Sequence, residues 1–472
     1  MSCSLGSEDS LDLIKQESQN SKLDPWVANP PLLQKLVSSS PALFRFQSTQ
    51  DSPLFKLKDI SGKVFELPRG GCVAITSAGP IQFGIPPETI KDSLNLGFEI
   101  PNYYVIPKSR WDKMFHMSVA EFEFPAYFNF FVKKKKITLI CTKEAKKAIR
   151  VIFRETLLGP KTFEFFDQEF FPGYKGKPDI VKELAHFSKN PFNHNLPLTV
   201  SSLLDFIIFD ENGFCFLLPH LNKFLGLAYL PNEVTIRKEQ KIFTVLEKDV
   251  EIAQVRDRIR IRVDENLEDY KDQLRYGLFM NPAIEMDEKK LEIYKEKYKP
   301  IQFDPPTFGV TILGSGHGFD PKGNTSGYIV WINGRGVMVD PPPFSTHLLK
   351  KMGVPSIMIE WIIITHCHAD HDAGTFQKIL ESTKVEVITT KTIMGSFIRK
   401  YAAVVDMNEK DLAQLFKFRP VVIGAPLKFN SATFNFFYSL HAIPCIGFSV
   451  SYKNKSMFFS ADTFYDPTAF FS

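Results

Sequence analysis

Residues 307–472 alternate between short apolar runs and segments whose apolar positions recur every three to four residues, which predicts alternating strands and helices. The run at 361–365 is apolar almost throughout, as in a strand that is buried on both faces. Further strands are predicted at 308–313, 328–333, 336–340, 385–389, 433–438, 446–452 and 456–460. Helices are predicted at 345–352 and 373–381. A hairpin followed by strand–helix units predicts a layered α/β fold with helices outside two sheets.

Residues 26–300 show a different, mixed α+β pattern, and we expect an N-terminal domain of unknown role there. Strands are predicted at 72–77, 103–106 and 137–141, and a helix is predicted at 143–158. Two apolar runs flank Asn212-Gly213, which is typical of a hairpin turn. The polar residues 1–25 are predicted to be disordered. Prolines make 301–306 the predicted linker, and the sequence shows no internal repeat.

Composition narrows the class of protein. The chain has 57 basic and 53 acidic side chains, a net charge of +4, which argues against a polycation that binds nucleic acid non-specifically. The apolar runs fall short of the roughly 18 residues of a membrane span. The six cysteines include no CxxC pair. The sequence therefore predicts a soluble cytoplasmic protein without a membrane partner.

Three of the ten histidines lie within six residues, directly after the apolar run at 361–365. His366 and His368 are two residues apart, so in extended backbone their side chains point the same way and can bind one ion. Asp370 and His371 follow where the next helix is expected to begin, and they face a second position. Imidazole and carboxylate ligands suit Zn²⁺, with Fe or Mn as alternatives.

The segment from Thr365 to Gly374 reads THCHADHDAG, and with this motif residues 307–472 resemble the metallo-β-lactamase superfamily. The resemblance implies an αββα sandwich with a metal site at the edge of its two sheets. His441 is similar to the isolated third histidine of that family, and Asp462 is similar to its metal-bridging aspartate. By position, one metal ion would be held by His366, His368 and His441, the other by Asp370 and His371, with Asp462 between them.

An aspartate at position 462, where true lactamases have cysteine, resembles the hydrolase branches of glyoxalase II, tRNase Z and related phosphodiesterases. This likeness implies two divalent metal ions, Zn²⁺ first, and a metal-bridging hydroxide as the nucleophile. Asp370 is the catalytic candidate, because its carboxylate could orient the hydroxide or take its proton. Cys445 lies nearby in the sequence, but its position favours a buried thiol over a ligand.

A glycine-rich segment follows the first predicted strand, and it is similar to the corresponding loop of tRNase Z and the phosphodiesterases. Its candidate substrate or phosphate contacts are Gly316, His317, Asn324 and Ser326. A plain turn between sandwich strands explains the same residues equally well. His317 is also a weak candidate for the acid that protonates the leaving group, against the simpler interpretation of a surface histidine.

The superfamily supplies one more histidine after the bridging aspartate, whereas this chain ends ten residues after Asp462 and has no histidine after His441. We therefore expect a truncated sandwich, from a fragment or a truncated gene model first, or else a site that a partner chain completes or an inactive remnant. An exposed sheet edge would favour an oligomer. We expect a weaker second metal site and impaired or absent turnover by residues 1–472, an expectation that robust metal-dependent turnover by the purified chain would contradict.

Three functions remain open from the sequence. The first is a metal-dependent hydrolase that cleaves a phosphodiester in a nucleotide or at an RNA 3′ end. The second is a thioester hydrolase of the glyoxalase II type, because carbonyl and phosphoryl groups suit the same hydroxide. The third is a non-catalytic binding or regulatory protein whose large N-terminal domain is the working part.

Overall fold

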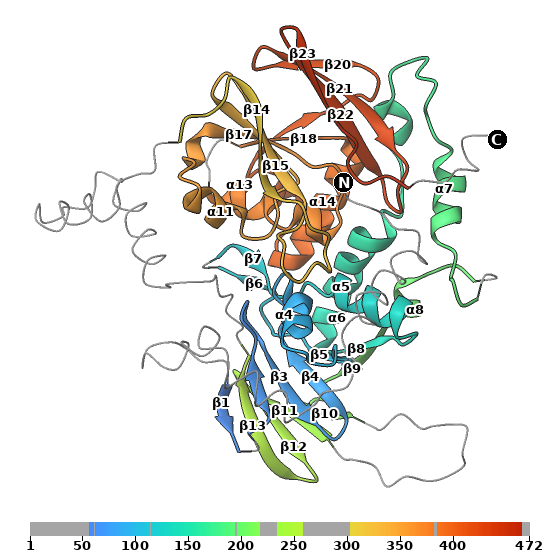
Figure 1. The fold of residues 1–472 in the computed structure, drawn as a ribbon. Helices are drawn as coiled ribbons and strands as arrows, with labels where there is room; N and C mark the ends of the chain where they lie inside the picture. Colours follow the sequence, from blue (N-terminus) through green and yellow to red (C-terminus); the bar gives the residue numbers. More distant parts are fainter. Residues whose placement is uncertain are drawn as a thin grey trace, which may run out of the picture.

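The computed structural model describes residues 56–60, 62–113, 115–193, 196–217, 234–257, 303–381 and 385–464. These residues form two sandwiches of β-sheets, one at each end of the molecule, with helices of both between them (Figure 1). Residues 1–25, predicted to be disordered, lie outside the described residues. The same holds for residues 258–302, which include the start of the expected linker at 301–306. The expected domain boundaries therefore stay a prediction.

The larger sheet of the C-terminal sandwich has six strands in sequence order, from β14 to β19. They are β14 (Phe308–Gly314), β15 (Gly327–Ile332), β16 (Arg335–Val339), β17 (Ile359–Ile363), β18 (Glu386–Thr389) and β19 (Lys417–Pro420). The first three pair antiparallel, and β16 to β19 pair in parallel. Asn333 and Gly334 form the two-residue turn between β15 and β16. Their φ angles of 49° and 73° have the left-handed geometry that such short turns require.

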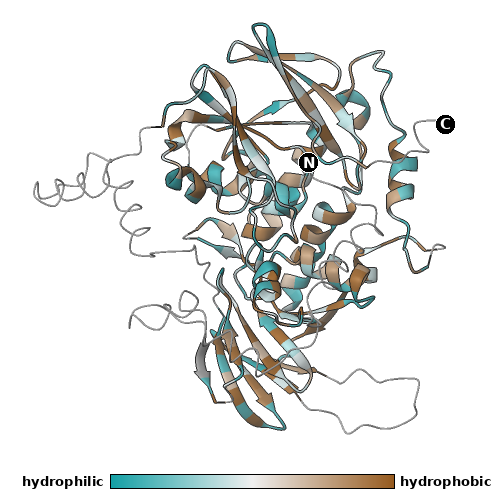
Figure 2. Cartoon of the chain, viewed as in Figure 1, coloured by the Kyte–Doolittle hydropathy of each residue, from teal (hydrophilic) through white to brown (hydrophobic). Residues whose placement is uncertain are grey.

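The smaller sheet is antiparallel and closes the core of this sandwich. Its strands are β20 (Pro426–Phe429), β21 (Ala432–Ser439), β22 (Cys445–Tyr452) and β23 (Lys455–Phe459). Alternate residues of β21 face inward, so Phe434 and Phe436 are buried while Asn435 between them is exposed. They join Trp331 of the larger sheet in one buried cluster. Figure 2 shows hydrophobic residues along the strands of both sheets.

Helices cover the face of the larger sheet that is turned away from the smaller one (Figure 1). They are α11 (Ser345–Lys351), α12 (Ala369–Asp372), α13 (Thr375–Glu381), α14 (Lys391–Val405) and α15 (Glu409–Ala413), with a 3₁₀ turn η4 (Ser356–Met358). Helix α14 begins after Thr390, whose hydroxyl accepts the N–H of Ile393. Its buried stripe includes Ile393, Phe397 and Tyr401, four residues apart.

The N-terminal sandwich is also built from two sheets. Its six-stranded sheet contains β2 (Val64–Glu66), β3 (Cys72–Thr76), β4 (Gly79–Phe83), β5 (Tyr103–Val105), β8 (Ile137–Cys141) and β9 (Leu204–Ile208). Its second sheet contains β1 (Lys56–Asp59), β10 (Phe214–Leu217), β11 (Val234–Glu239), β12 (Ile242–Glu247) and β13 (Val250–Arg256). Side chains from both sheets share one buried cluster, which includes Phe83 and Phe243. Strands β6 (Trp111–Asp112) and β7 (Met117–Ser118) form a separate ribbon.

The helices of the N-terminal half face those of the C-terminal half. They are α4 (Thr89–Asn95), α5 (Glu123–Tyr127), α6 (Lys143–Phe153), α7 (Ile180–Phe187) and α8 (Val200–Leu203), with η1 (Phe128–Val132), η2 (Arg154–Leu158) and η3 (Phe166–Glu169). Helix α6 packs on its own sheet and against α14, and Val404 of α14 lies in the same buried cluster as Ile149 of α6. The two sandwiches therefore share one layer of buried helices.

The strands and helices predicted from the apolar pattern are present, but the hairpin predicted at Asn212-Gly213 is wrong. The chain does turn there, and Gly213 has a φ of 83°. However, β9 pairs in parallel with β8, and β10 pairs antiparallel with β11 in the other sheet. The turn carries the chain from one sheet to the other, and side chains of both runs pack in the cluster between the two sheets. Within the described residues, no helix has both the length and the apolar character needed to span a bilayer.

Removing the indole of Trp331 is expected to destabilise the C-terminal sandwich. Trp331 is 0% exposed and its Nε1 donates to Thr311 Oγ1 at 2.8 Å, so Trp331→Ala leaves a cavity and an unpaired hydroxyl. We expect a loss of about 3–5 kcal/mol in the free energy of unfolding, measured by denaturant titration. The control Ile357→Ala, at a side chain that is 79% exposed, should change it by about 0.5 kcal/mol or less. Equal losses in the two variants would contradict the assigned core.

Candidate metal centre

The strands that carry the predicted site residues end at one edge of the C-terminal sandwich. The motif follows β17, and Asp340 follows the neighbouring parallel strand β16. His441 follows β21 and Asp462 follows β23, which run in the same direction on either side of β22. The topology of the two sheets therefore brings together side chains that are far apart in the chain.

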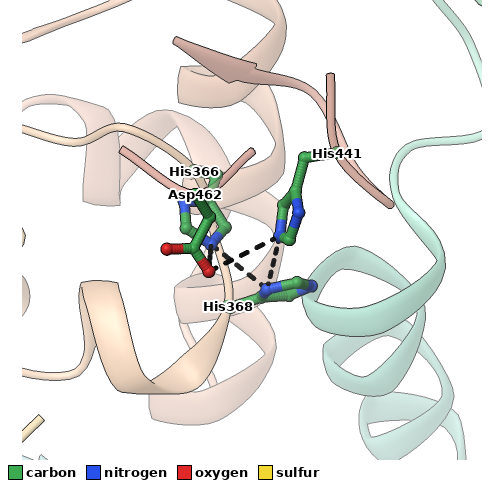
Figure 3. A group of neighbouring side chains, drawn as sticks. All are labelled: His366, His368, His441 and Asp462. Atoms are coloured by element: carbon green, nitrogen blue, oxygen red, sulfur yellow. Dashed lines mark hydrogen bonds and ion pairs between the residues drawn. The ribbon is translucent and has the colours of Figure 1, made fainter. Parts of the chain in front are cut away.

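His366, His368, His441 and Asp462 form a compact cluster in which one atom of each side chain lies within 4.8 Å of the others (Figure 3). His366 Nε2 and His441 Nε2 each lie 3.1 Å from His368 Nδ1. Asp462 Oδ2 lies 4.0 Å from His366 Nε2 and 3.9 Å from His441 Nε2. Three imidazoles and a carboxylate thus face one small volume.

His371 faces the same carboxylate oxygen of Asp462 as the histidines of the cluster. Its Nε2 lies 3.5 Å from Asp462 Oδ2 and 3.8 Å from Asp370 Oδ2. The six residues that the sequence resemblance implied therefore lie together, and which of them bind which metal ion stays a prediction.

A residue that the sequence reasoning missed, Asp340, holds the motif in place. Asp340 Oδ1 accepts the backbone N–H of Thr365 at 2.8 Å, and Oδ2 accepts the Thr365 hydroxyl at 2.6 Å. Oδ2 also lies 3.0 Å from His371 Nδ1. Since an ionised carboxylate only accepts, Nδ1 of His371 carries the proton, and its Nε2 is turned toward Asp462 and Asp370.

The same network fixes the tautomer of His366. The hydroxyl proton of Thr365 goes to Asp340, so Thr365 Oγ1 accepts the Nδ1–H of His366 at 2.9 Å. The Nε2 of the neutral His366 ring is then left as a lone pair that points into the cluster. A lone pair in this position is what a metal ligand requires.

The geometry of the cluster fits a tetrahedral metal ion. Ligand nitrogens at about 2.1 Å from Zn²⁺ in tetrahedral arrangement would lie about 3.4 Å from one another. The measured nitrogen separations of 3.1 Å are close to that value. Moreover, His368 Nδ1 faces two Nε2 atoms at once, and a single proton cannot satisfy both contacts. A divalent cation at the centre would satisfy all of these lone pairs together.

The protonation states that burial favours also suit a metal ion. Burial lowers the pKa of His366 and of His368 well below the ordinary range, and that of His441 to about 4, so these rings are neutral. Burial alone would raise the pKa of Asp462, but His371 beside it holds that pKa well below its usual value. Neutral imidazoles and an ionised carboxylate are the ligand forms that a divalent cation binds.

Glu123 of α5 reaches this site from the N-terminal half, and nothing in the sequence pointed to it. Its Oε2 accepts the backbone N–H of Ala369 at 2.9 Å, inside the metal motif. One of its oxygens also lies within 4.8 Å of a ring nitrogen of His368 and a carboxylate oxygen of Asp370. Burial raises the pKa of Glu123 to about 8, which Lys400 opposes and Asp370 reinforces.

The glycine-rich loop bonds mainly within itself. Gly316 N–H donates to the carbonyl of Asn324 at 2.9 Å, and Ser326 Oγ donates to the carbonyl of Gly316 at 3.2 Å. His317 is exposed, and its Nδ1 accepts the N–H of Phe319. None of these side chains joins the His/Asp groups found among the described residues. A role of Gly316, His317, Asn324 and Ser326 in substrate binding stays a prediction.

Cys445 lies beside the cluster without entering it. Its Sγ is 3.6 Å from His366 Nδ1, the ring nitrogen that is turned away from the other histidines, and 3.4 Å from the carbonyl oxygen of Asp462. Burial raises the pKa of this thiol well above its usual value. A buried, protonated thiol in this position matches the interpretation made from the sequence.

Comparison with known proteins agrees with the motif. Residues 308–471 match the family model described as Anti-Pycsar protein Apyc1. Among curated proteins of Dictyostelium discoideum, the cGMP-dependent 3′,5′-cGMP phosphodiesterase A is 34% identical over an alignment that covers 86% of this chain and 56% of that protein. The cAMP/cGMP-dependent 3′,5′-cAMP/cGMP phosphodiesterase B is 32% identical, over 87% of this chain and 38% of its own length. The chain thus spans about half, or less, of these relatives.

The complete motif, the strand order and the converging side chains agree with the fold that the sequence resemblance implied. The C-terminal part of the chain is similar to proteins of the metallo-β-lactamase fold. Among solved structures, the chain is similar to the metallo-β-lactamase fold protein YhfI from Bacillus subtilis, which is 20% identical and aligns over 34% of this chain and 64% of its own, with a TM-score of 0.29. Human short-form tRNase Z is 20% identical over 32% of this chain and 68% of its own, with a TM-score of 0.27.

The position of Asp340 behind the metallo-β-lactamase motif predicts a measurable role in metal binding. Asp340→Asn keeps the size of the side chain but replaces one accepting oxygen by an NH₂ group, so Thr365 and His371 lose part of their support. We expect metal affinity to fall about 10- to 100-fold, measured by competition with a chromophoric chelator.

The matched control for Asp340→Asn is Asp406→Asn, at an aspartate whose side chain is 95% exposed. This variant should bind metal as the wild type does. Unchanged affinity in Asp340→Asn would show that the motif holds its geometry without that carboxylate.

Proposed function

We propose that this protein is a metal-dependent phosphodiesterase that hydrolyses the phosphodiester of a 3′,5′-cyclic nucleotide. The observation that carries the proposal is the cluster of His366, His368, His441 and Asp462 beside His371 and Asp370, because it has the donor set of a two-metal hydrolase. The substrate class is supported by the names of the two curated relatives, both phosphodiesterases of 3′,5′-cyclic nucleotides.

The metal ions would be held as the sequence resemblance implies, with Zn²⁺ as the first candidate and Fe or Mn as alternatives. His366, His368 and His441 would hold one ion, Asp370 and His371 the other, and Asp462 would contact both. When bound, divalent ions at such a site supply Lewis-acid charge next to the scissile phosphate and lower the pKa of water.

The side chains of this protein would orient the metal ligands and accept a proton from the attacking water. Asp340 fixes the direction of His371, and Thr365 fixes that of His366, so both rings present their ligand nitrogens before substrate arrives. Asp370 Oδ2 lies 3.8 Å from His371 Nε2, and Asp370 is the candidate to accept a proton from the attacking water. Its side chain is 16% exposed, so solvent can reach it.

A cytoplasmic location is part of the proposal. The described cysteines Cys72, Cys141, Cys215, Cys367 and Cys445 are all buried free thiols. Unpaired thiols suit a reducing compartment such as the cytoplasm.

The test compares substrates on the purified chain after its metal content has been measured. We expect slow hydrolysis of cyclic AMP or cyclic GMP that stops on chelation, returns with Zn²⁺, Mn²⁺ or Fe²⁺, and exceeds cleavage of a glutathione thioester or an RNA 3′ end. Asp462→Asn should reduce turnover by about 100-fold or more, because the carboxylate that faces the histidines of the cluster and His371 loses its charge. The control Asp406→Asn should keep the wild-type rate.

Each other outcome separates the alternatives. Preferential cleavage of the thioester would support the glyoxalase II type instead, and preferential cleavage of RNA would move the substrate class to RNA. Bound metal with none of these activities would contradict the hydrolase and favour the binding or regulatory protein.

A further inference from the structure

The two sandwiches repeat the same strand arrangement. In the N-terminal six-stranded sheet, β2, β3 and β4 pair antiparallel and β4, β5, β8 and β9 pair in parallel. The C-terminal sheet has the same series of pairings from β14 to β19. Each six-stranded sheet packs on an antiparallel sheet on one face and on helices on the other (Figure 1). The sequence analysis found no repeat, so the similarity is one of structure.

The repeat holds residue by residue at its start. Every pair of the β3–β4 hairpin, such as Cys72 with Phe83, has a counterpart 256 positions later in β15–β16, such as Tyr328 with Val339. Four residues in this stretch are identical to their counterparts: Gly71 and Gly327, Pro86 and Pro342, Pro87 and Pro343, and Gly97 and Gly353. A Cβ on Gly71 would meet the carbonyl oxygen of Gly84, and one on Gly327 would meet that of Asp340, again equivalent positions.

The helices that follow also correspond. Helices α4 and α11 each have seven residues, and each begins after a left-handed residue, Glu88 with a φ of 64° and Phe344 with a φ of 63°. Helices α6 and α14 each begin after a threonine whose hydroxyl accepts the N–H three residues on, Thr142 and Thr390. Non-glycine residues seldom adopt left-handed backbone, so its recurrence at the same place argues for one ancestral plan.

The histidines of the metal motif, in contrast, are not repeated. Ile81 pairs with Tyr103, and Val337, 256 positions after Ile81, pairs with Trp361, so Tyr103 corresponds to Trp361. By the offset that relates Tyr103 to Trp361, Lys108 and Arg110 stand where the C-terminal sandwich has His366 and His368, while Asp112 stands where it has Asp370. Lysine and arginine cations do not bind a divalent cation, so the N-terminal sandwich lacks the two imidazole ligands of the motif.

The loop of each sandwich reaches the helix of the other. Arg110 Nε donates to the carbonyl of Ala403 at the end of α14, at 3.0 Å. Reciprocally, Thr156 Oγ1 in η2 lies 2.9 Å from the carbonyl oxygen of Cys367 in the metal motif. The two contacts lie at neighbouring positions of the repeat, because Thr156 corresponds to position 404, next to Ala403, when Thr142 is aligned with Thr390.

Glu123 completes the contact on the metal side. Its Oε2 accepts from the Thr156 hydroxyl at 2.6 Å and from the Ala369 N–H at 2.9 Å, and all three residues are buried or nearly so. Ala369 is the first residue of α12, the single turn that carries Asp370 and His371. Lys400 of α14 adds a donor to Thr156 Oγ1 and to the carboxylate of Asp372 at the other end of that turn.

We propose that the N-terminal sandwich is a second copy of the metallo-β-lactamase fold that has lost these two histidines and now positions the metal motif of the first, with Glu123 as the positioning residue. The inference rests on the proposed metal site but not on the proposed substrate. Glu123 anchors the N-terminal end of α12 and thereby sets where Asp370 and His371 lie relative to Asp462. Without its carboxylate, the Ala369 N–H is left buried and unpaired, and the turn must shift to satisfy it.

The test measures metal binding by the full chain carrying Glu123→Ala, Glu123→Gln or Glu155→Gln. Glu155 is the matched control, because it is a buried glutamate that pairs with Arg399 across the same helical layer without touching the motif. The readouts are affinity by chelator competition, metal stoichiometry, the visible absorption spectrum of the Co²⁺-substituted protein, and the thermal midpoint as a check on folding.

We expect Glu123→Ala to weaken the weaker of the two metal sites about 10- to 100-fold and to change the Co²⁺ spectrum. Glu123→Gln should restore most of the affinity, because its amide oxygen can still accept the Ala369 N–H. Glu155→Gln should lower the thermal midpoint while leaving metal affinity and spectrum unchanged. If the role of Glu123 were purely structural, Glu123→Ala would behave as Glu155→Gln does: the thermal midpoint would fall while metal affinity and the Co²⁺ spectrum stayed unchanged.

Two outcomes would overturn the inference. Wild-type affinity and spectrum in a folded Glu123→Ala variant would show that the motif does not need this anchor, whatever the protein hydrolyses. A wild-type chain that binds no metal would remove the site that both proposals share. Metal binding that depends on Glu123 without any phosphodiesterase activity would support this inference and contradict the proposed function.

Discussion

The site depends on the free-energy cost of taking polar groups out of water. His366, His371 and Asp340 are all buried, and an unpaired N–H or carboxylate there would destabilise the fold. One carboxylate, that of Asp340, meets this requirement for three donors at once. Hydrogen bonds to Asp340 and Thr365 occupy Nδ1 of His371 and Nδ1 of His366. The Nε2 atom of each of these two rings is therefore left to face the cluster. The ligand geometry is therefore a consequence of where the surrounding protons are bonded.

The sequence predicted the parts of this arrangement that are local. His366 and His368 share a direction because they leave a buried strand two residues apart, and the apolar run of that strand is visible in the sequence. His441 and Asp462 were implied by the family resemblance alone, and both lie in the cluster. Asp340 could have been found from its position, since it ends the strand that pairs in parallel with the motif strand.

The parts that were missed are set by distant contacts. A turn such as Asn212-Gly213 fixes the local backbone, but it does not say whether the next strand returns to the same sheet, and here it does not. Glu123 has no signal of its own, because its role comes from an N–H that lies 246 residues away in the chain. The repeat is hidden because hydrophobic side chains can be exchanged while pairing register and left-handed turns persist, as Glu88 and Phe344 illustrate.

The helical layer between the sandwiches also makes each half of the chain depend on the other for the burial of its apolar side chains. Helices α6 and α14 bury apolar side chains against each other, among them Ile149 and Val404, and the reciprocal loop contacts cross the same layer. Severing the chain between the halves would expose those stripes to water on both fragments. Because each half covers apolar side chains of the other, we expect the two halves to be kept together as one chain.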